Sequence, residues 1–171
     1  MKQAVLDAPS VSPGVDELSA ELMVMIGRLT RTVTRSAGLD VPTASLRLLS
    51  QLDELGPVTI GTLAEADRCS QPTMSSTVQT VCRRGLARKT RNPHDGRSSL
   101  VALTDAGRSV LDDARRQRAA VVVDLFAHDP EHDERDLATA VAVVRGLLAA
   151  RAIDHLDARR GEDPDNAEGD A

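Results

Sequence analysis

The sequence predicts a mainly α-helical fold that carries one small β-hairpin. Apolar residues recur at spacings of three and four along most of the chain, which is the period of an amphipathic helix. Two short strand-like runs flank a turn over residues 92–97, as in a hairpin. The 171 residues include one Phe and neither Trp nor Tyr. The core must therefore be aliphatic, which suits helices packed on helices.

Two helices are predicted before the turn-rich middle of the chain. The first begins after a cap at Asp16 and ends at Gly38. Its apolar face is formed by Leu18, Leu22, Met25, Leu29 and Val33. The second opens at Pro42-Thr43 and stops at Gly56-Pro57. Its inward-facing residues are Leu46, Leu49 and Leu52.

The next two predicted helices have the spacing of a helix-turn-helix. A helix over residues 59–67 is capped by Thr59, and a helix over residues 70–84 is capped by Ser70. A tight turn at Arg68-Cys69 joins them, and Pro72 is tolerated in the first turn of the second. The residues expected to pack inward are Ile60, Leu63, Ala64, Met74, Thr77, Val78 and Val81.

The hairpin and two long helices complete the predicted fold. Strand-like runs over residues 86–90 and 98–103 flank the Asn92–Arg97 turn. Thr104 caps a helix that reaches about Ala127, and its apolar residues are Val110, Leu111, Ala114, Val122 and Leu125. A last helix follows the Asp129-Pro130 break and carries Leu137, Val141, Val144, Leu148 and Leu156.

These elements predict a winged helix-turn-helix domain over residues 42–104 with helical extensions over 16–38 and 105–157. Residues 1–15 and the acidic residues 158–171 are expected to be disordered. The chain shows neither a signal peptide nor an apolar run of membrane-spanning length, so we expect a soluble cytoplasmic protein.

The net charge of −5 is unevenly distributed along the chain. Residues 68–97 hold seven basic residues and one acidic residue, a local charge of +6, so the other 141 residues carry −11. A basic patch on an acidic body favours localised contact with phosphate groups.

The predicted helix over residues 70–84 has an outer face suited to the major groove. Gln can pair with adenine, and Ser and Thr can bind bases or phosphates, whereas a carboxylate would be repelled. This face contains no carboxylate and consists of Gln71, Pro72, Thr73, Ser75, Ser76 and Gln79. The alternative is an ordinary polar face that meets water, although such faces usually carry Glu and Lys.

Basic residues beside this helix predict contacts with the DNA backbone. The expected phosphate contacts are Arg83, Arg84, Arg88, Lys89 and Arg91. At the tip of the hairpin, Arg97, with His94 nearby, is expected to enter the minor groove. Asp95 is expected to orient the Arg97 guanidinium by a charge-assisted hydrogen bond, or to act as a simple turn former.

The sequence leaves three other interpretations open. A winged helix could serve as a protein-interaction module without DNA binding. Cys69 precedes a helix N-terminus beside Arg68, which favours a reactive thiolate, so a redox-sensing role competes with a plain filler of the turn.

A metal site is the third alternative. The densest set of potential ligands is His128, Asp129, Glu131, His132 and Asp133, but Pro130 indicates an inter-helix turn instead. Cys69 and Cys82 have neither metal-ligand spacing nor a disulfide pattern. No phosphate-binding glycine loop and no nucleophile–base pair is evident in the sequence. We therefore expect no catalytic activity and no cofactor.

The combined motifs resemble the MarR family of winged-helix transcriptional regulators over about residues 15–157. The signature is Asp95-x-Arg97 followed by Leu103-Thr104-x-x-Gly107. Supporting matches are Leu63-Ala64, Ser70 with Thr73 and Ser75, and Arg84-Gly85-Leu86.

The resemblance implies an obligate homodimer, joined by its terminal helices, that represses transcription and releases DNA when a small ligand binds. Aliphatic runs over 121–123 and 141–144 independently favour a partner chain, and a two-fold dimer would read a pseudo-palindrome. Phe126 is the only aromatic residue, so a stacking pocket is hard to build. The candidate effector pocket is lined by Met23, Met25 and Leu46.

Overall fold

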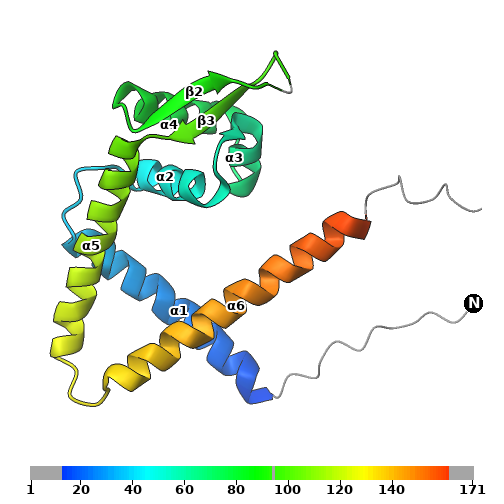
Figure 1. Ribbon diagram of the computed structural model, residues 1–171. Helices are drawn as coiled ribbons and strands as arrows, with labels where there is room; N and C mark the ends of the chain where they lie inside the picture. The colour runs from blue at the N-terminus through cyan, green and yellow to red at the C-terminus, as the bar shows by residue number, and fades with distance from the viewer. Residues whose placement is uncertain (1–12, 94, 162–171) are drawn as a thin grey trace, which may run out of the picture. The chain divides into compact units, whose positions relative to one another are not determined.

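The fold is mainly helical, with a small antiparallel sheet, as predicted. A computed structural model describes residues 13–93 and 95–161 (Figure 1). Within these residues the helices are α1 (Pro13–Ser36), α2 (Thr43–Leu55), α3 (Ile60–Ala66), α4 (Gln71–Arg83), α5 (Asp105–Ala127) and α6 (Glu134–Gly161). The strands are β1 (Val58–Thr59), β2 (Ala87–Arg91) and β3 (Ser99–Leu103). The described residues divide after Leu125 into two compact units.

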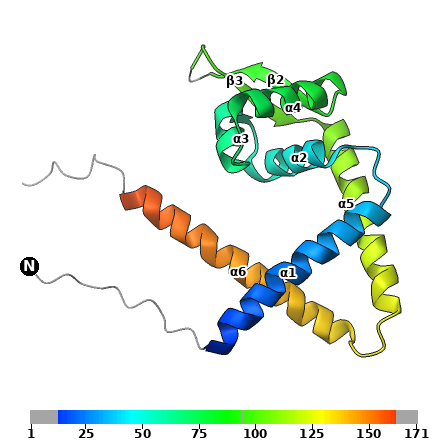
Figure 2. The same ribbon diagram turned by 180° about the vertical axis from the view of Figure 1, so that it is seen from behind.

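The core of the first unit lies among α2, α3, α4, the sheet and the beginning of α5, which Figures 1 and 2 show gathered together. It is aliphatic, as the composition predicts. Its most deeply buried large side chains are Leu48, Leu49, Leu52, Leu63, Val78, Val81 and Val101. Leu48 was not among the predicted inward residues of α2. It is buried because α2 contacts both α4 and β3, so more than one face of the helix is covered.

The sheet contains a strand that the sequence pattern does not reveal. β3 lies in the centre and pairs with β2 on one side and with β1 on the other. In β1, Val58 lies opposite Val101 and Thr59 opposite Leu100. A two-residue strand has no measurable periodicity, so only the tertiary pairing defines it.

Three predicted caps are confirmed. The Thr59 hydroxyl accepts a hydrogen bond from the Thr62 N–H at 3.2 Å, and the Ser70 hydroxyl accepts one from the Thr73 N–H at 3.3 Å. The Thr104 hydroxyl accepts one from the Gly107 N–H at 3.1 Å. Each hydroxyl satisfies an amide that the first turn of its helix leaves without an intrahelical partner.

The boundaries of the terminal helices differ from those expected. α1 begins at Pro13, so Asp16 lies within the first turn instead of capping it, and residues 13–15 are helical. Proline is favoured in the first turn, where its missing N–H costs nothing. α6 continues past residue 157 to Gly161. Residues 1–12 and 162–171, and the side chain of Leu156, lie outside the described parts.

The junction between the hairpin and α5 is tightly built around Thr104. Its hydroxyl donates to the Gly85 carbonyl at 2.7 Å while it caps α5, and its N–H donates to the Leu86 carbonyl at 3.2 Å. A Cβ at Gly107 would lie 2.0 Å from the Leu86 oxygen. Residue 107 must therefore be glycine, which gives the Leu-Thr-x-x-Gly motif its physical basis.

The second unit contains the turn after α5 and the helix α6. Asp133 caps α6 by accepting from the Arg135 N–H at 2.8 Å and the Asp136 N–H at 3.2 Å. Asp136 reaches back to the Asp133 N–H at 2.9 Å, which completes a reciprocal cap. None of the helices in the described ranges combines the length and the apolar character that a membrane crossing requires.

Candidate nucleic-acid interface

Helices α3 and α4 form the predicted helix-turn-helix. Between them Arg68 adopts a left-handed conformation with φ of 50°, and the Cys69 N–H donates to the Ala64 carbonyl at 3.0 Å. Asp67 ties this turn to α2, because its carboxylate lies 2.7 Å from Arg47 Nε and accepts from Gln51 Nε2 at 3.3 Å. These two contacts across the fold were missed by sequence reasoning, which sees only local spacing.

Helix α4 has the two faces that its sequence predicts. Met74, Val78 and Val81 are buried. Thr77 is half-buried, and its hydroxyl donates to the Thr73 carbonyl at 3.2 Å. The predicted DNA-facing residues are exposed, except for half-buried Ser75: Gln71, Pro72, Thr73, Ser75, Ser76 and Gln79. The described α4 therefore presents hydrogen-bonding side chains without a carboxylate.

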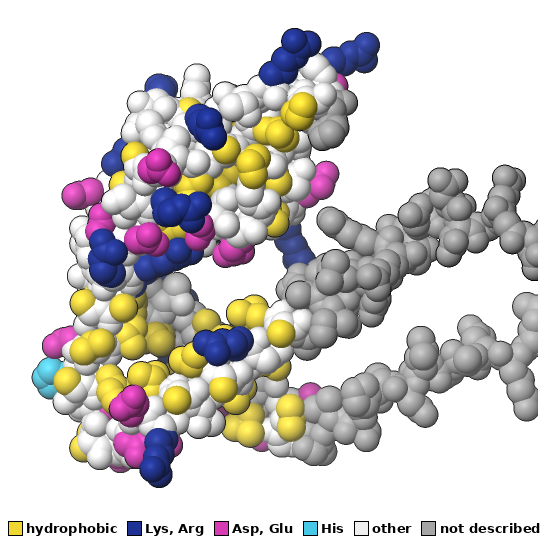
Figure 3. All heavy atoms as spheres, viewed as in Figure 1, with side chains coloured by type: hydrophobic (Ala, Val, Ile, Leu, Met, Phe, Trp, Pro, Cys, Tyr) yellow, Lys and Arg dark blue, Asp and Glu magenta, His cyan; other side chains and the backbone are white. Residues whose placement is uncertain are grey.

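The hairpin projects cations from its exposed strand. β2 is paired from Ala87 opposite Leu103 to Arg91 opposite Ser99. Successive side chains of a strand point to opposite faces, so Lys89 and Arg91 lie on one face and Arg88 on the other. Figure 3 shows Lys and Arg side chains protruding at the end of the hairpin. All seven cations of the basic patch are exposed: Arg68, Arg83, Arg84, Arg88, Lys89, Arg91 and Arg97.

The turn of the hairpin is held by hydrogen bonds that correct one expectation. The Asp95 carboxylate accepts from the backbone N–H of Arg97 at 2.9 Å, so this bond orders the turn and does not orient the guanidinium. The Ser98 N–H donates to the Asp95 carbonyl at 3.1 Å, and Asn92 Nδ2 donates to the Ser98 hydroxyl at 2.9 Å. Asp95 thus acts as a turn former, the plainer of its two predicted roles. His94 lies outside the described residues.

A cleft of about 750 Å³ separates the beginning of α4 from the hairpin. Its lining includes Gln71 and Ser75 from α4 and Lys89, Asn92 and Arg97 from the hairpin. The structure thus places some of the predicted DNA-contacting residues around one cleft. Thr73, Ser76 and Gln79 lie elsewhere on α4, and Arg83 near its end donates to the Thr80 hydroxyl at 3.4 Å.

The candidate effector residues differ in exposure. Met23 and Met25 are exposed on α1, whereas Leu46 is buried in the core of the first unit. Both cysteines are half-buried. Burial raises the pKa of the Cys82 thiol, an effect that nearby Lys89 partly opposes.

The possible metal ligands after α5 form a polar turn. The Asp129 carboxylate accepts from the Glu131 N–H at 2.9 Å, and its other oxygen lies 2.9 Å from His132 Nδ1. These contacts lower the pKa of Asp129, and Asp129 raises the pKa of His132. Among the residues whose positions are described, no three potential ligands are grouped to hold a metal.

Comparison with known proteins connects this geometry to a family. The sequence model of the MarR family matches residues 39–98, which contain the helix-turn-helix and most of the hairpin. The HTH-type transcriptional regulator Mb0904 of Mycobacterium bovis is 28% identical over 126 residues, covering 73% of this chain and 87% of that protein. The HTH-type transcriptional regulator YxaD of Bacillus subtilis is 31% identical over 107 residues, covering 61% of this chain and 73% of that protein.

A solved structure extends the similarity beyond the matched segment. The crystal structure of a putative transcriptional regulator from Pseudomonas aeruginosa is 28% identical and superposes with a TM-score of 0.66. The alignment covers 81% of this chain and 98% of that protein, so it extends well beyond residues 39–98.

Proposed function

Because the chain belongs to the MarR family of winged-helix transcriptional regulators, we propose that it binds a pseudo-palindromic DNA operator as a homodimer. In this proposal α4 lies in the major groove, and the β2–β3 hairpin follows the adjacent backbone into the minor groove. Bound at a promoter, the dimer represses transcription by occupying the DNA. We place this activity in the cytoplasm.

The observation that carries the proposal is the exposed face of α4 together with the cations around it. Gln71 and Gln79 are exposed amides that can pair with adenine in the major groove. Carboxylates are missing from this face in the described α4, so nothing on it repels phosphate. Lys89 and Arg97 stand across the cleft from Gln71, where the DNA backbone would run.

The homodimer is supported by apolar side chains that each unit leaves exposed. In α1 the large hydrophobic residues exposed to solvent are Val15, Leu18, Met23, Val24, Met25, Ile26 and Leu29. In α6 they are Leu137, Val141, Val143, Leu147 and Leu148. Extended apolar surfaces of this kind mark interaction sites. A two-fold dimer would present two copies of α4 about one DNA turn apart.

Release from DNA by a small-molecule effector is part of the proposal. Met23 and Met25 are the exposed members of the expected effector pocket. Leu46, the third member, is on α2 and is buried in the core of the first unit.

Selection from random duplexes tests the proposed function. The wild-type protein is incubated with a randomised DNA pool, and the bound sequences are amplified and read over several rounds. We expect enrichment of an inverted repeat whose half-sites lie about one helical turn, or 10 base pairs, apart. An unenriched pool would contradict DNA recognition and favour a protein-interaction module.

A further inference from the structure

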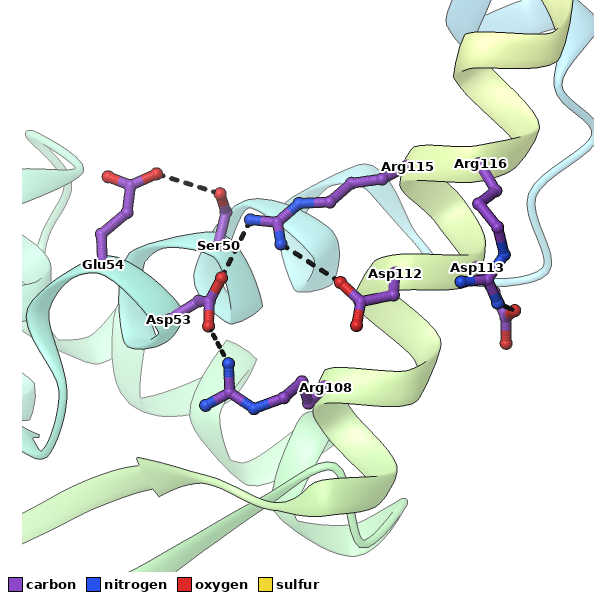
Figure 4. A network of polar contacts seen from close by, with 8 residues as sticks. All are labelled: Ser50, Asp53, Glu54, Arg108, Asp112, Asp113, Arg115 and Arg116. Atoms are coloured by element: carbon purple, nitrogen blue, oxygen red, sulfur yellow. Dashed lines mark hydrogen bonds and ion pairs between the residues drawn. The ribbon is translucent and has the colours of Figure 1, made fainter.

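The long helix α5 is attached to the helix-turn-helix unit through two sets of contacts. The first is the junction of Thr104 and Gly107 with the end of α4, and Leu111 and Ala114 are buried in the core just beyond it. The second is an ion-pair cluster between α5 and α2, centred on Asp53 (Figure 4). We call this cluster the Asp53 clamp: Asp53, Arg108, Asp112 and Arg115.

The geometry of the Asp53 clamp joins one carboxylate to two turns of α5. Asp53 Oδ1 pairs with Arg108 Nη1, and Asp53 Oδ2 lies 3.0 Å from Arg115 Nη2. Arg115 is itself oriented by Asp112, whose Oδ1 lies 3.3 Å from Arg115 Nη1. Because each carboxylate oxygen has its own guanidinium, both rotation and sliding of α5 against α2 would break a contact.

The clamp differs from an ordinary surface ion pair in the shielding of its centre. The Asp53 side chain is only 17% exposed. The hydrogen bond from Arg115 holds the pKa of Asp53 below its usual value, so the carboxylate is charged at neutral pH. By contrast, Asp113 and Arg116 form an exposed ion pair within α5 itself.

The clamp lies where α5 leaves the core. Of the described α5 residues, Gly107, Leu111 and Ala114 are the buried ones, and Arg115 follows directly. From Arg115 to Leu125 the helix extends about 15 Å at 1.5 Å per residue. A change of about 10° in its direction would move Leu125 by about 3 Å, which is close to the rise of about 3.4 Å per base pair.

We propose that Asp53 is a positioning residue which, through Arg108 and Arg115, fixes the direction of α5 and thereby sets the half-site spacing that the dimer accepts. The inference rests on the proposed function, because half-site spacing has meaning only for a DNA-binding dimer. The direction of α5 against α2 is a property of one chain and can be measured without DNA.

The first experiment measures that direction by distances between two spin labels. Cysteines replace exposed Glu65 on α3 and exposed Ala120 on α5 in a Cys69→Ser, Cys82→Ser background. Labelled chains are diluted with unlabelled ones, so that each measured pair lies within one chain. We expect a narrow distance distribution for the labelled protein with Asp53 intact and for the same protein with Asp113→Asn, the matched control. Asp53→Asn should broaden the distribution, and Asp53→Glu should give a width between those of Asp53→Asn and the protein with Asp53 intact. An unchanged distribution in folded Asp53→Asn would overturn the proposal.

The second experiment measures affinity for operators whose half-sites are moved apart or together by one base pair. For the wild type and for Asp113→Asn we expect each one-base-pair change in spacing to weaken binding about tenfold or more, because the second α4 no longer meets its half-site. For Asp53→Asn we expect the penalty to fall to about threefold or less. Melting temperatures of the variants verify folding.

The outcomes separate the two proposals. An undiminished spacing penalty in Asp53→Asn would overturn the role of the clamp while leaving DNA recognition intact. If the wild type selects no sequence, the proposed function and the spacing role both fail. The label distances would then still decide whether Asp53 fixes α5.

Discussion

Arg97 is placed at the end of the hairpin by the residues around it. The Asp95 carboxylate holds the Arg97 N–H, and Ser98 closes the turn on the Asp95 carbonyl. These bonds fix the backbone while leaving the guanidinium exposed. An ordered turn loses less conformational entropy when its exposed cation meets DNA.

Replacing Arg97 with Ala tests the predicted role of the hairpin. Loss of one phosphate or minor-groove contact should weaken binding to both operator and random duplex and should reduce the salt slope by about one. Fluorescence anisotropy across a salt series measures both quantities. Arg116→Ala, which removes an exposed cation from α5, is the control. If Arg97→Ala binds like the wild type, the hairpin does not contact DNA.

Asp95 offers a comparison between two substitutions that remove the same charge. The amide oxygen of Asp95→Asn can still accept the Arg97 N–H, whereas Asp95→Ala cannot. The loss of such a local cap costs about 1 kcal/mol, so Asp95→Ala should bind operator about fivefold more weakly than Asp95→Asn. Equal affinities in the same anisotropy assay would show that the turn hydrogen bond does not support binding.

Among the elements, α4 was the most predictable. Its cap, its buried stripe and its polar face all follow from local spacing, so Ser70, Val78 and Gln79 were placed correctly by sequence alone. By contrast, β1 and the Asp53 clamp depend on contacts between distant segments. Asp53 and Arg115 are 62 residues apart, and no periodic pattern connects them.

Truncating the glutamines of α4 tests base recognition. Gln71→Ala or Gln79→Ala should lower affinity for the selected operator by about 1–3 kcal/mol if the residue reads a base. Affinity for random duplex should change little, because phosphate contacts remain. The ratio of the two affinities is the measured quantity. Equal losses on both duplexes would contradict a base-reading role.

The junction between the hairpin and α5 gives a stability prediction. In Gly107→Ala the added Cβ would collide with the Leu86 carbonyl, which is backbone and cannot rotate away. We expect a destabilisation of about 1–3 kcal/mol or more, measured by chemical denaturation. Gly146→Ala in α6 is the control, because its Cβ meets no atom within 4 Å. The two variants should differ clearly; equal stabilities would contradict the close approach.

For the whole molecule, charge and apolar surface are divided between different regions. The +6 patch of residues 68–97 coincides with α4 and the hairpin, while the remainder carries −11. This division explains how an acidic protein can approach DNA in one orientation. The sequence predicts this separation of charge. The direction in which each cation points depends on the fold and could not be predicted. The Asp95 carboxylate illustrates that limit, since spacing alone suggested the Arg97 side chain as its partner.

The exposed apolar residues of α1 and α6 predict that charge placed there disrupts the dimer. Leu148→Lys should lower the molar mass measured by light scattering toward 18.2 kDa and weaken operator binding. Leu55→Lys introduces the same charge at a 48% exposed leucine of α2 and should leave the dimer intact. If the Leu148→Lys protein stays dimeric, α6 does not form part of the dimer interface.

A salt titration of operator affinity tests whether α4 and the basic hairpin bind DNA. If the dimer makes six or more phosphate contacts, affinity should fall about 1,000-fold or more between 50 and 200 mM salt. A scrambled duplex should bind more weakly throughout the series. Undetectable binding to every duplex at low salt, or an affinity that salt does not change, would show that α4 and the hairpin do not bind the DNA backbone.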